Sequence, residues 1–372
     1  MRVVVAQETV DGERRVAVVP DTVATLTAAG CDVAVQAGAG LGAFVADADL
    51  AARGASVVTD RAQLLQGADV VLAVQPLPVG DVSHLRAGAI SVSFLQPWAH
   101  GQAVRALAAR SVTSFSLDLV PRISRAQPMD ALSSQALVAG YRAVMLAASN
   151  APRLFPLFMT AAGTVPPAKV LVLGAGVAGL PAIATARRLG AVVTAYDVRS
   201  AAGEEVRSLG ATFLDLELDT QEGEGGYARV QSQEFLARQR ALIAEQVERV
   251  DVVVTTAAVP GRPAPLLVTA EMVAVMRAGS IIVDLGADVE ASEGGGNCEL
   301  TRAGETIEVN GVTILGPRNA ASAYPLHASA LYARNVANLL MLMTRDGELD
   351  PDWNDEIVAG CCITRNGEVI ER

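Results

Sequence analysis

The sequence predicts an α/β protein with two parallel-sheet domains, the second of them inserted into the first. Short apolar runs alternate with helical patterns along the chain, and this alternation is typical of parallel strands joined by helices. A chain of 372 residues is also long for one hydrophobic core and sufficient for two. We expect the first domain to comprise residues 1–133 and 320–372, and the second to comprise residues 134–319.

The first domain should open with alternating strands and helices. The apolar runs that predict its strands are Val3–Ala6, Asp32–Gln36, Val70–Val74, Ile90–Phe94 and Val112–Leu117. The helical patterns between them are Thr22–Ala29, Arg61–Gln66 and Gln102–Ala109. A long helix, Ser134–Ala151, should lead into the second domain and end before Pro152, because proline cannot continue a helix.

The second domain repeats the alternation. Its expected strands are Val170–Leu173, Val192–Tyr196, Val252–Thr256, Ile281–Leu285 and Val312–Leu315. A final helix, Leu326–Met343, is expected to pack back on the first domain. The C-terminal tail should form a short hairpin around Asn366–Gly367, since Asn-Gly favours a two-residue turn.

Composition excludes several classes of function. The formal charge of −11 argues against a nucleic-acid surface, because phosphate binding needs clustered lysine or arginine. No stretch reaches about 18 uninterrupted apolar residues, so we expect no direct membrane insertion. The four cysteines lack the spacing of a zinc site, and no metal is expected. Reduced thiols in a soluble, cytoplasmic protein are the simplest interpretation.

The strongest local motif is a glycine-rich loop. It follows an apolar strand and precedes a helix, and it consists of Gly174, Ala175, Gly176, Val177, Ala178 and Gly179. A second strand then ends at Asp197, which completes the strand–helix–strand context of a dinucleotide site. Gly174 would permit the tight turn, Gly176 would let the backbone approach a pyrophosphate, and Gly179 would allow close helix packing. The alternative is a tight turn that binds no ligand.

The residues after the second strand bear on cofactor choice. Asp197 should accept hydrogen bonds from the adenosine ribose and repel a 2′-phosphate, which favours NAD(H) over NADP(H). Arg199 weakens that preference, since an arginine here can accommodate phosphate. We therefore predict a Rossmann-like, NAD(H)-binding second domain, to which Ala175, Val177 and Val198 contribute backbone around the cofactor.

Acid–base residues are scarce. A dehydrogenase that oxidises a metabolite needs a proton acceptor near the nicotinamide, usually histidine or lysine. Lys169 is the sole lysine and opens the strand before the glycine loop, at the end opposite the cofactor crevice. His84, His100 and His327 are each more typical of surface or core histidines than of a catalytic base. Direct hydride transfer between two nicotinamides needs no such group, only aligned positioning.

Further motifs are spread nearly from end to end of the chain. They are RISRAQPMDALSSQ (122–135), GYRAV (140–144), the glycine loop with AIATARRLGA (182–191), GGYAR (225–229), TTAAVPGRPAP (255–265), GGGNC (294–298) and CCITRNGEV (361–369). This set shows a resemblance to the NAD(H)-binding subunit of proton-translocating transhydrogenases, a family related to alanine dehydrogenase. It implies a homodimer bound to a membrane-spanning, proton-conducting subunit and to a domain that holds NADP(H). It also implies hydride transfer between NADH and NADP+, at the inner face of the cell membrane, where the chain is peripheral.

The resemblance also assigns site residues. It implies that a loop made by Arg122, Gln127, Asp130 and Ser133 reaches the nicotinamide, with Gln127 positioning the carboxamide and ribose. The alternative for this loop is a capped turn before the following helix, which suits the serine and aspartate better than the arginine and glutamine.

A second loop is also implied. Residues 219–232, with Gly226 and Tyr227 near the tip, resemble a mobile loop that closes over bound NAD(H), although an ordinary surface loop has the same composition. Gln239 and Ala258 match further cofactor contacts.

Two departures separate the chain from relatives that oxidise alanine. Those relatives carry a catalytic lysine and histidine where this chain has Gln75 and Gln96. Arg15 matches their substrate-carboxylate arginine. A stand-alone amino-acid dehydrogenase and a non-catalytic NAD(H)-sensing module stay open as alternatives to the transhydrogenase component.

Overall fold

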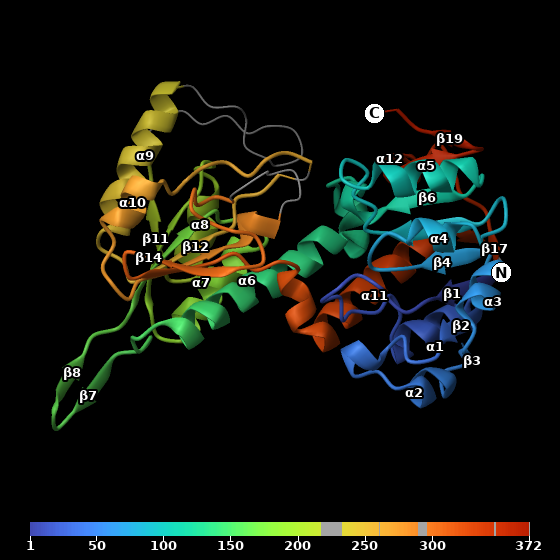
Figure 1. The fold of residues 1–372 in the computed structure, drawn as a ribbon, viewed down its shortest axis with the longest axis horizontal. Coiled ribbons are helices and arrows are strands. Elements are labelled where there is room, and N and C mark those ends of the chain that lie inside the picture. Colours follow the sequence, from blue (N-terminus) through green and yellow to red (C-terminus); the bar gives the residue numbers. More distant parts are fainter. Residues whose placement is uncertain (217–232, 260, 289–295, 346, 372) are drawn as a thin grey trace. The chain divides into compact units, whose positions relative to one another are not determined.

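The structure, a computed structural model, describes residues 1–372 apart from 217–232, 260, 289–295, 346 and 372. The chain divides into two compact units. Unit 1 comprises Met1–Gln135 and Ala321–Arg372, and unit 2 comprises Ala136–Ala320. Along the chain, helix α6 (Ala131–Asn150) carries the backbone from unit 1 into unit 2 (Figure 1).

Unit 1 is built around an eight-stranded sheet in the order β19-β18-β6-β5-β4-β1-β2-β3. The part from β6 to β3 is parallel throughout. These strands are β1 (Arg2–Val5), β2 (Asp32–Gln36), β3 (Ser56–Val58), β4 (Val70–Leu72), β5 (Ile90–Ser93) and β6 (Thr113–Ser116). The chain winds outward from β1 and from β4 in opposite directions, which is the strand order of a doubly wound, Rossmann-like sheet.

Apolar side chains cover both faces of this sheet. Strand side chains alternate between faces, so Val3 and Val5 join one core while Val4 joins the other. Helices α1 (Pro20–Ala28) and α11 (Pro325–Leu342) pack in the first core, which confirms that the final helix returns to this domain. Helices α3 (Arg61–Gln66) and α5 (Gly101–Ala109) pack in the second. The shorter elements are α2 (Asp47–Ala51), α4 (Val79–Val82), α12 (Glu356–Cys361), β16 (Thr344–Arg345), β17 (Glu348–Leu349) and the 3-10 turns η1 (Leu41–Ala43), η2 (Leu117–Leu119) and η3 (Ser124–Met129).

The predicted C-terminal hairpin is confirmed, and it adds two strands to one edge of the unit 1 sheet. Strands β18 (Cys362–Arg365) and β19 (Glu368–Val369) flank Asn366 and Gly367, whose φ angles are +53° and +84°. Because β18 pairs antiparallel with β6, the mostly parallel sheet becomes mixed at this edge. Strand β3 was not predicted, since it is three residues long and too exposed to produce an apolar alternation.

Unit 2 repeats the architecture with seven strands in the order β11-β10-β9-β12-β13-β15-β14. They are β9 (Lys169–Leu173), β10 (Val192–Tyr196), β11 (Thr212–Leu214), β12 (Val252–Thr255), β13 (Ile281–Asp284), β14 (Thr306–Val309) and β15 (Val312–Leu315). Only β14, among the described strands of this sheet, runs antiparallel to its neighbour. Helices α6, α7 (Gly179–Arg188) and α8 (Ala202–Ser208) pack on one face, and α9 (Gln233–Val247) and α10 (Ala270–Ala274) pack on the other.

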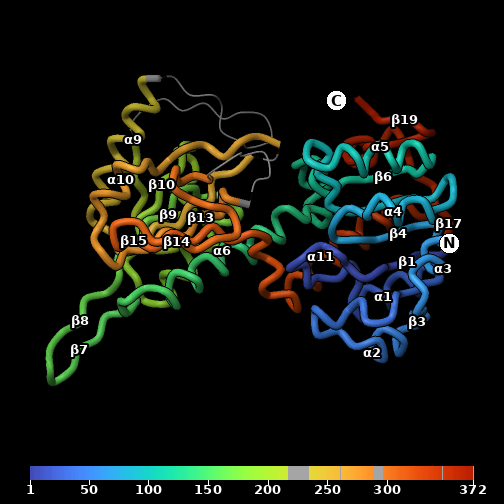
Figure 2. Tube along the Cα trace, viewed as in Figure 1, coloured from blue at the N-terminus to red at the C-terminus, as the bar shows by residue number. Residues whose placement is uncertain are grey.

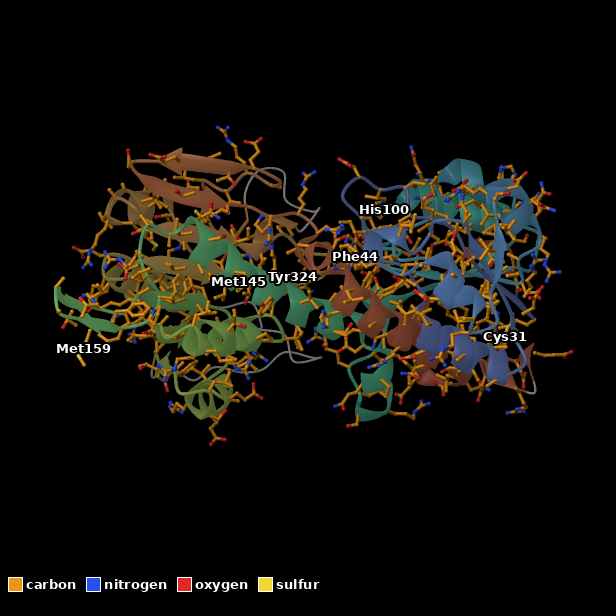
Figure 3. The ribbon with its side chains drawn as sticks, turned by 90° about the horizontal axis from the view of Figure 1, so that it is seen from below. Cys31, Phe44, His100, Met145, Met159 and Tyr324 are labelled. Carbon is orange, nitrogen blue, oxygen red and sulfur yellow. The ribbon has the colours of Figure 1, made fainter. Side chains whose placement is uncertain are left out.

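A two-stranded hairpin extends from unit 2, separate from its main sheet. Strands β7 (Phe158–Thr160) and β8 (Gly163–Val165) pair with each other, and Figure 2 shows the hairpin leaving the body of unit 2. Met159, labelled in Figure 3, is 79% exposed on β7. Within the described residues, no helix combines the length and the apolar content that crossing a bilayer requires.

Candidate dinucleotide site

The glycine loop of unit 2 follows β9 at the point where the strand order reverses. Strand β9 leads on to β10 on one side, whereas its neighbour β12 leads on to β13 on the other. In sheets of this kind, ligands bind in the crevice at the carboxyl ends of the two central strands. The loop from Gly174 to Gly179 therefore lies where a dinucleotide site is expected.

Two glycines of the loop are required by close packing. Gly174 has a φ of +99°, and a Cβ there would lie 2.6 Å from the Thr256 Oγ1 atom. A Cβ at Gly179 would overlap the carbonyl oxygen of Gly174. The first turn of α7 thus rests directly on the loop. A larger residue at Gly179 would push the helix away from the loop, and one at Gly174 would collide with Thr256.

Gly176 differs from these two because it faces open space. The nearest heavy atom to a Cβ there would be Arg199 Nη2, at 3.8 Å. Helix α7 begins just beyond, and its N-cap, Ala178, has no side-chain capping bond. Exposed backbone beside the positive end of a helix dipole attracts anions, so this part of the loop fits a pyrophosphate. Val177 is 42% exposed at the same turn, whereas Ala175 is fully buried.

Asp197, the first residue after β10, is tied to the loop. Its Oδ2 accepts the backbone N–H of Ala175 at 2.8 Å. Its Oδ1 accepts the backbone N–H and the Nε–H of Arg199, at 2.9 Å and 3.0 Å. Arg199 Nη2 adds a bond to Oδ2 at 3.2 Å. The structure thus brings together the acidic residue, the arginine and the glycine loop that the sequence singled out.

A pocket opens beside Asp197 at the ends of β10 and β11. It is lined by Tyr196, Asp197, Val198, Ser200, Phe213, Asp215, Leu216 and Phe235. Phe213 and Phe235 supply aromatic side chains to its lining, and neither was singled out by the sequence. Phe213 could have been found, since it lies in a short strand of the same parallel sheet.

Gln239 lies on α9 and is buried. Its side-chain amide donates to the hydroxyl of Tyr196 at 3.2 Å. Burial raises the pKa of Tyr196 to about 12, so the phenol stays neutral at physiological pH. In this structure Gln239 therefore supports the end of β10, and its contact with a cofactor stays a prediction.

The segment after β12 forms the other wall of the crevice. The Thr256 hydroxyl donates to the carbonyl of Gly174 at 3.0 Å, which joins the two central strands across the crevice. Ala257 exchanges two hydrogen bonds with the side chain of Asn297, and Ala258 beyond it is exposed. Asn297 also donates to the carbonyl of Pro265 at 2.8 Å. One buried side chain thus holds two stretches of this wall.

Asp284 anchors the same region from the end of β13. It is fully buried, and its carboxylate accepts five hydrogen bonds from the Thr255 hydroxyl, the backbone N–H groups of Gly286, Asn297 and Cys298, and the Thr301 hydroxyl. Five donors compensate a buried charge that has lost its water. Neither Asp284 nor Asn297 was predicted individually from the sequence, although Asp284 lies in the predicted strand Ile281–Leu285 and Asn297 belongs to the GGGNC segment.

The predicted nicotinamide loop lies in unit 1, and half of it is a capped turn. The backbone N–H and hydroxyl of Ser133 both donate to the carboxylate of Asp130, at the start of α6. This is the capping arrangement that the sequence left open for these two residues. Their part in cofactor binding stays a prediction, and a capping carboxylate has the capacity to accept further hydrogen bonds.

The other half of the loop is exposed. Arg122 and Gln127 reach the surface, while the carbonyl of Pro128 accepts amide bonds from Asn335 and Asn338 of α11, at 2.8 Å and 3.0 Å. The loop is therefore anchored beneath by its backbone and presents its two long polar side chains outward. Gly226 and Tyr227, the predicted tip of the closing loop, lie outside the described residues.

Arg15, which matches the substrate-binding arginine of alanine dehydrogenases, belongs to a buried ion pair. Arg15 binds Glu13 through Nε and Nη2, at 2.8 Å and 2.6 Å, and its Nη1 donates to Gln135 at 2.9 Å. Gln75 donates to the same glutamate at 2.8 Å. Burial alone would raise the pKa of Glu13, but the pairing with Arg15 outweighs it and lowers that pKa to about 2.

Glu8 lies beside this pair. Its carboxyl accepts the backbone N–H groups of Val74 and Gln75, at 2.6 Å and 3.2 Å. Burial raises its pKa to about 7, and the nearby charge of Glu13 adds to that effect. Burial likewise raises the pKa of Asp118, which accepts the backbone N–H of Gln96 at 2.9 Å. The ends of the central strands of unit 1 therefore carry buried carboxyl groups, and each of these groups accepts hydrogen bonds from the protein.

The candidate bases lie in both units, Lys169 in unit 2 and the three histidines in unit 1. Lys169 begins β9, so it lies at the far end of the strand from the glycine loop, roughly 13 Å along it at 3.3 Å per residue. His327 is exposed on α11. His84 follows α4, and His100, labelled in Figure 3, is the N-cap of α5. In the described part of the chain, no cluster of three potential ligands could hold a metal ion.

Comparison with known proteins defines the family. The alanine dehydrogenase/PNT N-terminal domain matches residues 4–139, and the alanine dehydrogenase/PNT C-terminal domain matches residues 143–372. The chain belongs to the alanine dehydrogenase/PNT family. Both parts of that family's architecture are present, which confirms the two-domain α/β fold class.

The relatives of this chain within the alanine dehydrogenase/PNT family include transhydrogenases and alanine dehydrogenases. The first portion of the NAD(P) transhydrogenase alpha subunit of Rhodospirillum rubrum is 44% identical over 380 residues, covering 100% of this chain and 98% of that protein. The transhydrogenase structure from Sinorhizobium meliloti superimposes with a TM-score of 0.90 at 44% identity, with both chains fully covered. Alanine dehydrogenase of Mycobacterium tuberculosis is 34% identical over 77% of this chain and 73% of its own length. The resemblance to transhydrogenase is thereby confirmed.

Proposed function

We propose that this chain is the NAD(H)-binding component of an NAD(P) transhydrogenase, in which hydride passes directly between NADH and NADP+ held by a partner domain. The observation that carries the proposal is the combination of a glycine-lined crevice suited to a dinucleotide with Gln75 and Gln96, which stand where the resemblance places the acid–base residues of alanine dehydrogenases. Similarity to the transhydrogenase subunit over the full chain supports it.

The cofactor would be held by three features of unit 2. The open backbone at Gly176 and the start of α7 would take the pyrophosphate. Asp197 would accept the adenosine ribose hydroxyls, and the adjoining pocket with Phe213 would take the adenine. Ala258 lies on the exposed wall toward which the nicotinamide half would extend. Bound NADH supplies the hydride, and the protein supplies position.

Unit 1 would contribute orientation. Gln127 is exposed, carries both a donor and an acceptor, and sits on a loop whose backbone is anchored by Asn335 and Asn338. We propose that it binds the carboxamide and ribose of the nicotinamide half, with Arg122 beside it. A loop with a fixed backbone suits this role, because direct hydride transfer depends on the distance and alignment of the two nicotinamides and needs no proton transfer.

Further components of the assembly follow from the same proposal. The Rhodospirillum rubrum relative is itself one portion of a subunit, which supports the need for other chains. We propose a homodimer that binds an NADP(H)-binding domain and a membrane-spanning, proton-conducting subunit. The chain would then be peripheral to the inner face of the cell membrane through these partners.

An amino-acid dehydrogenase is the second candidate, because Arg15 matches the position that the resemblance gives to the substrate-binding arginine of alanine dehydrogenases. The alanine dehydrogenase of Mycobacterium tuberculosis is 34% identical to this chain. In this chain Arg15 is engaged by Glu13 and Gln135. Oxidation of NADH in the presence of pyruvate and ammonia separates the two functions. We expect none from the isolated protein, and robust turnover would favour the dehydrogenase.

The direct test mixes this chain with an NADP(H)-binding partner domain and measures reduction of an NAD analogue by NADPH. We expect turnover that requires both proteins. A partner domain known to work with another transhydrogenase subunit serves as the positive control. Failure with that competent partner, while NADH still binds, would contradict the proposed function and leave an NAD(H)-sensing module as the better interpretation.

A further inference from the structure

The ion pair between Asp197 and Arg199 has a bearing on cofactor selection. The carboxylate receives three bonds from Arg199, one from its backbone and two from its guanidinium. The fourth bond comes from Ala175 in the glycine loop. Side-chain exposure is 8% for the aspartate and 26% for the arginine, so the guanidinium is more open to solvent than the carboxylate.

The guanidinium also lies beside the cofactor crevice. Its Nη2 atom is 3.8 Å from the position that a Cβ on Gly176 would take, and Asp197, its partner, lines the pocket at the ends of β10 and β11. A positive charge thus stands next to the site proposed for the adenosine ribose. An arginine in this position is the usual partner of a 2′-phosphate.

The pairing changes how the aspartate acts. A free carboxylate would repel a 2′-phosphate by its charge, but a carboxylate joined to a guanidinium is largely neutralised. The pair discriminates in a different way. Asp197 binds the Nε–H and one Nη2–H of the guanidinium, so a phosphate that approaches this edge of Arg199 has to compete with an internal carboxylate for these two donors.

We propose that Arg199 is a latent ligand for an adenosine 2′-phosphate, and that Asp197 sets the preference for NAD(H) chiefly by holding its guanidinium. The inference rests on the proposed dinucleotide site and adds a specificity-determining residue to it. Asp215, a second acidic residue, lines the same pocket. Release of the arginine is expected to shift the preference toward 2′-phosphorylated ligands without abolishing NAD(H) binding.

The test is a double-mutant cycle on the whole chain. Asp197→Asn keeps an oxygen for the Ala175 N–H but removes the charge that holds the guanidinium, and Arg199→Ala removes the guanidinium itself. Isothermal titration calorimetry with adenosine 5′-diphosphate and with adenosine 2′,5′-bisphosphate compares the wild type, both single variants and the double variant. Thermal unfolding checks that each variant folds.

For Asp197→Asn, we expect the affinity for adenosine 2′,5′-bisphosphate to rise about tenfold, the strength of one charge-assisted bond pair. That gain should vanish in the double variant, and Arg199→Ala alone should gain nothing. An equal gain in the double variant would overturn the inference, because loss of repulsion alone would then explain it. No gain in Asp197→Asn would overturn it as well.

The same titrations separate this inference from the proposed function. If the wild type binds neither adenosine 5′-diphosphate nor NADH, the dinucleotide site itself is wrong and both proposals fall. If the wild type binds both ligands and only the double-mutant cycle fails, the cofactor site stands and the role assigned to Arg199 is wrong.

Discussion

Arg15 and Glu13 form a buried ion pair in unit 1, in which Arg15 Nη2 lies 2.6 Å from Glu13 Oε2 and the side chains are 4% and 0% exposed. Removing one partner of such a pair leaves a charge without water or counter-ion. We expect Arg15→Met to destabilise the protein by about 3–5 kcal/mol in urea unfolding. Arg345→Met, which breaks the exposed pair with Asp350, is the control and should cost less than about 1 kcal/mol. Similar costs for both variants would contradict the structural role of the buried pair.

Glu8 should make stability depend on pH near neutrality. Its pKa is raised from 4.5 to about 7, so the folded protein binds more protons than the unfolded chain between these values. Stability from this group is therefore present below pH 4.5 and is lost as pH rises toward 7, by an upper bound of about 3 kcal/mol. Glu13, with its pKa lowered to about 2, acts in the opposite direction and only below pH 4.5.

The variant Glu8→Gln isolates that effect. It should be more stable than the wild type at pH 8 and should lose the advantage by pH 5, because an amide carries no buried charge at either pH. Denaturant unfolding at intervals across this range measures the difference. A difference that does not change with pH would rule out Glu8 as the titrating group.

Alanine substitutions at two glycines of the loop should affect different properties of the protein. Gly179→Ala places a methyl group against the Gly174 carbonyl and should lower the melting temperature. Gly176→Ala meets only Arg199 Nη2 at 3.8 Å and should fold normally, yet weaken NADH binding by obstructing the pyrophosphate. Melting curves and NADH fluorescence titrations on both variants distinguish the two. If Gly176→Ala binds NADH as well as the wild type, the cofactor does not approach the loop at that residue.

Asn297 should be needed for the order of the crevice wall. It is fully buried and bonds Ala257 and Pro265, so Asn297→Ala would leave three backbone polar groups without partners. We expect a loss of about 2–4 kcal/mol in unfolding free energy. Asn150→Ala, an exposed position in the same unit, is the control and should be nearly neutral. A neutral Asn297→Ala would show that water replaces these bonds.

Gln127→Asn tests the proposed orienting residue. The shorter side chain keeps its chemistry but loses reach, so hydride transfer should slow while NADH binding changes little. Stopped-flow transfer rates and NADH titration give the two quantities separately. Asp197→Ala should have the reverse pattern, with weakened binding of NADH. Equal loss of NADH affinity in the two variants would contradict this division of roles.

Much of the fold follows from local pattern. The apolar runs that become β2, β10 and β15 match their predicted bounds, because strands buried on both faces are nearly all apolar. The glycine loop was also recognisable, since its φ and close contacts admit no side chain at Gly174 or Gly179. Strand β3 was missed because it is short and exposed, and β18 was not expected to join the sheet because strand pairing depends on residues distant in sequence.

The amino-acid sequence by itself determined the two α/β domains, the dinucleotide motif and the lack of a suitably placed lysine, since each depends on residue type and spacing. Only the tertiary structure decided which charges meet. Three sets of contacts depend on side-chain directions near strand ends. They are the hydrogen bonds of five donors to Asp284, the ion pair between Arg15 and Glu13, and the ion pair between Arg199 and Asp197. No local pattern encodes those directions, because the packing of whole sheets and helices sets them.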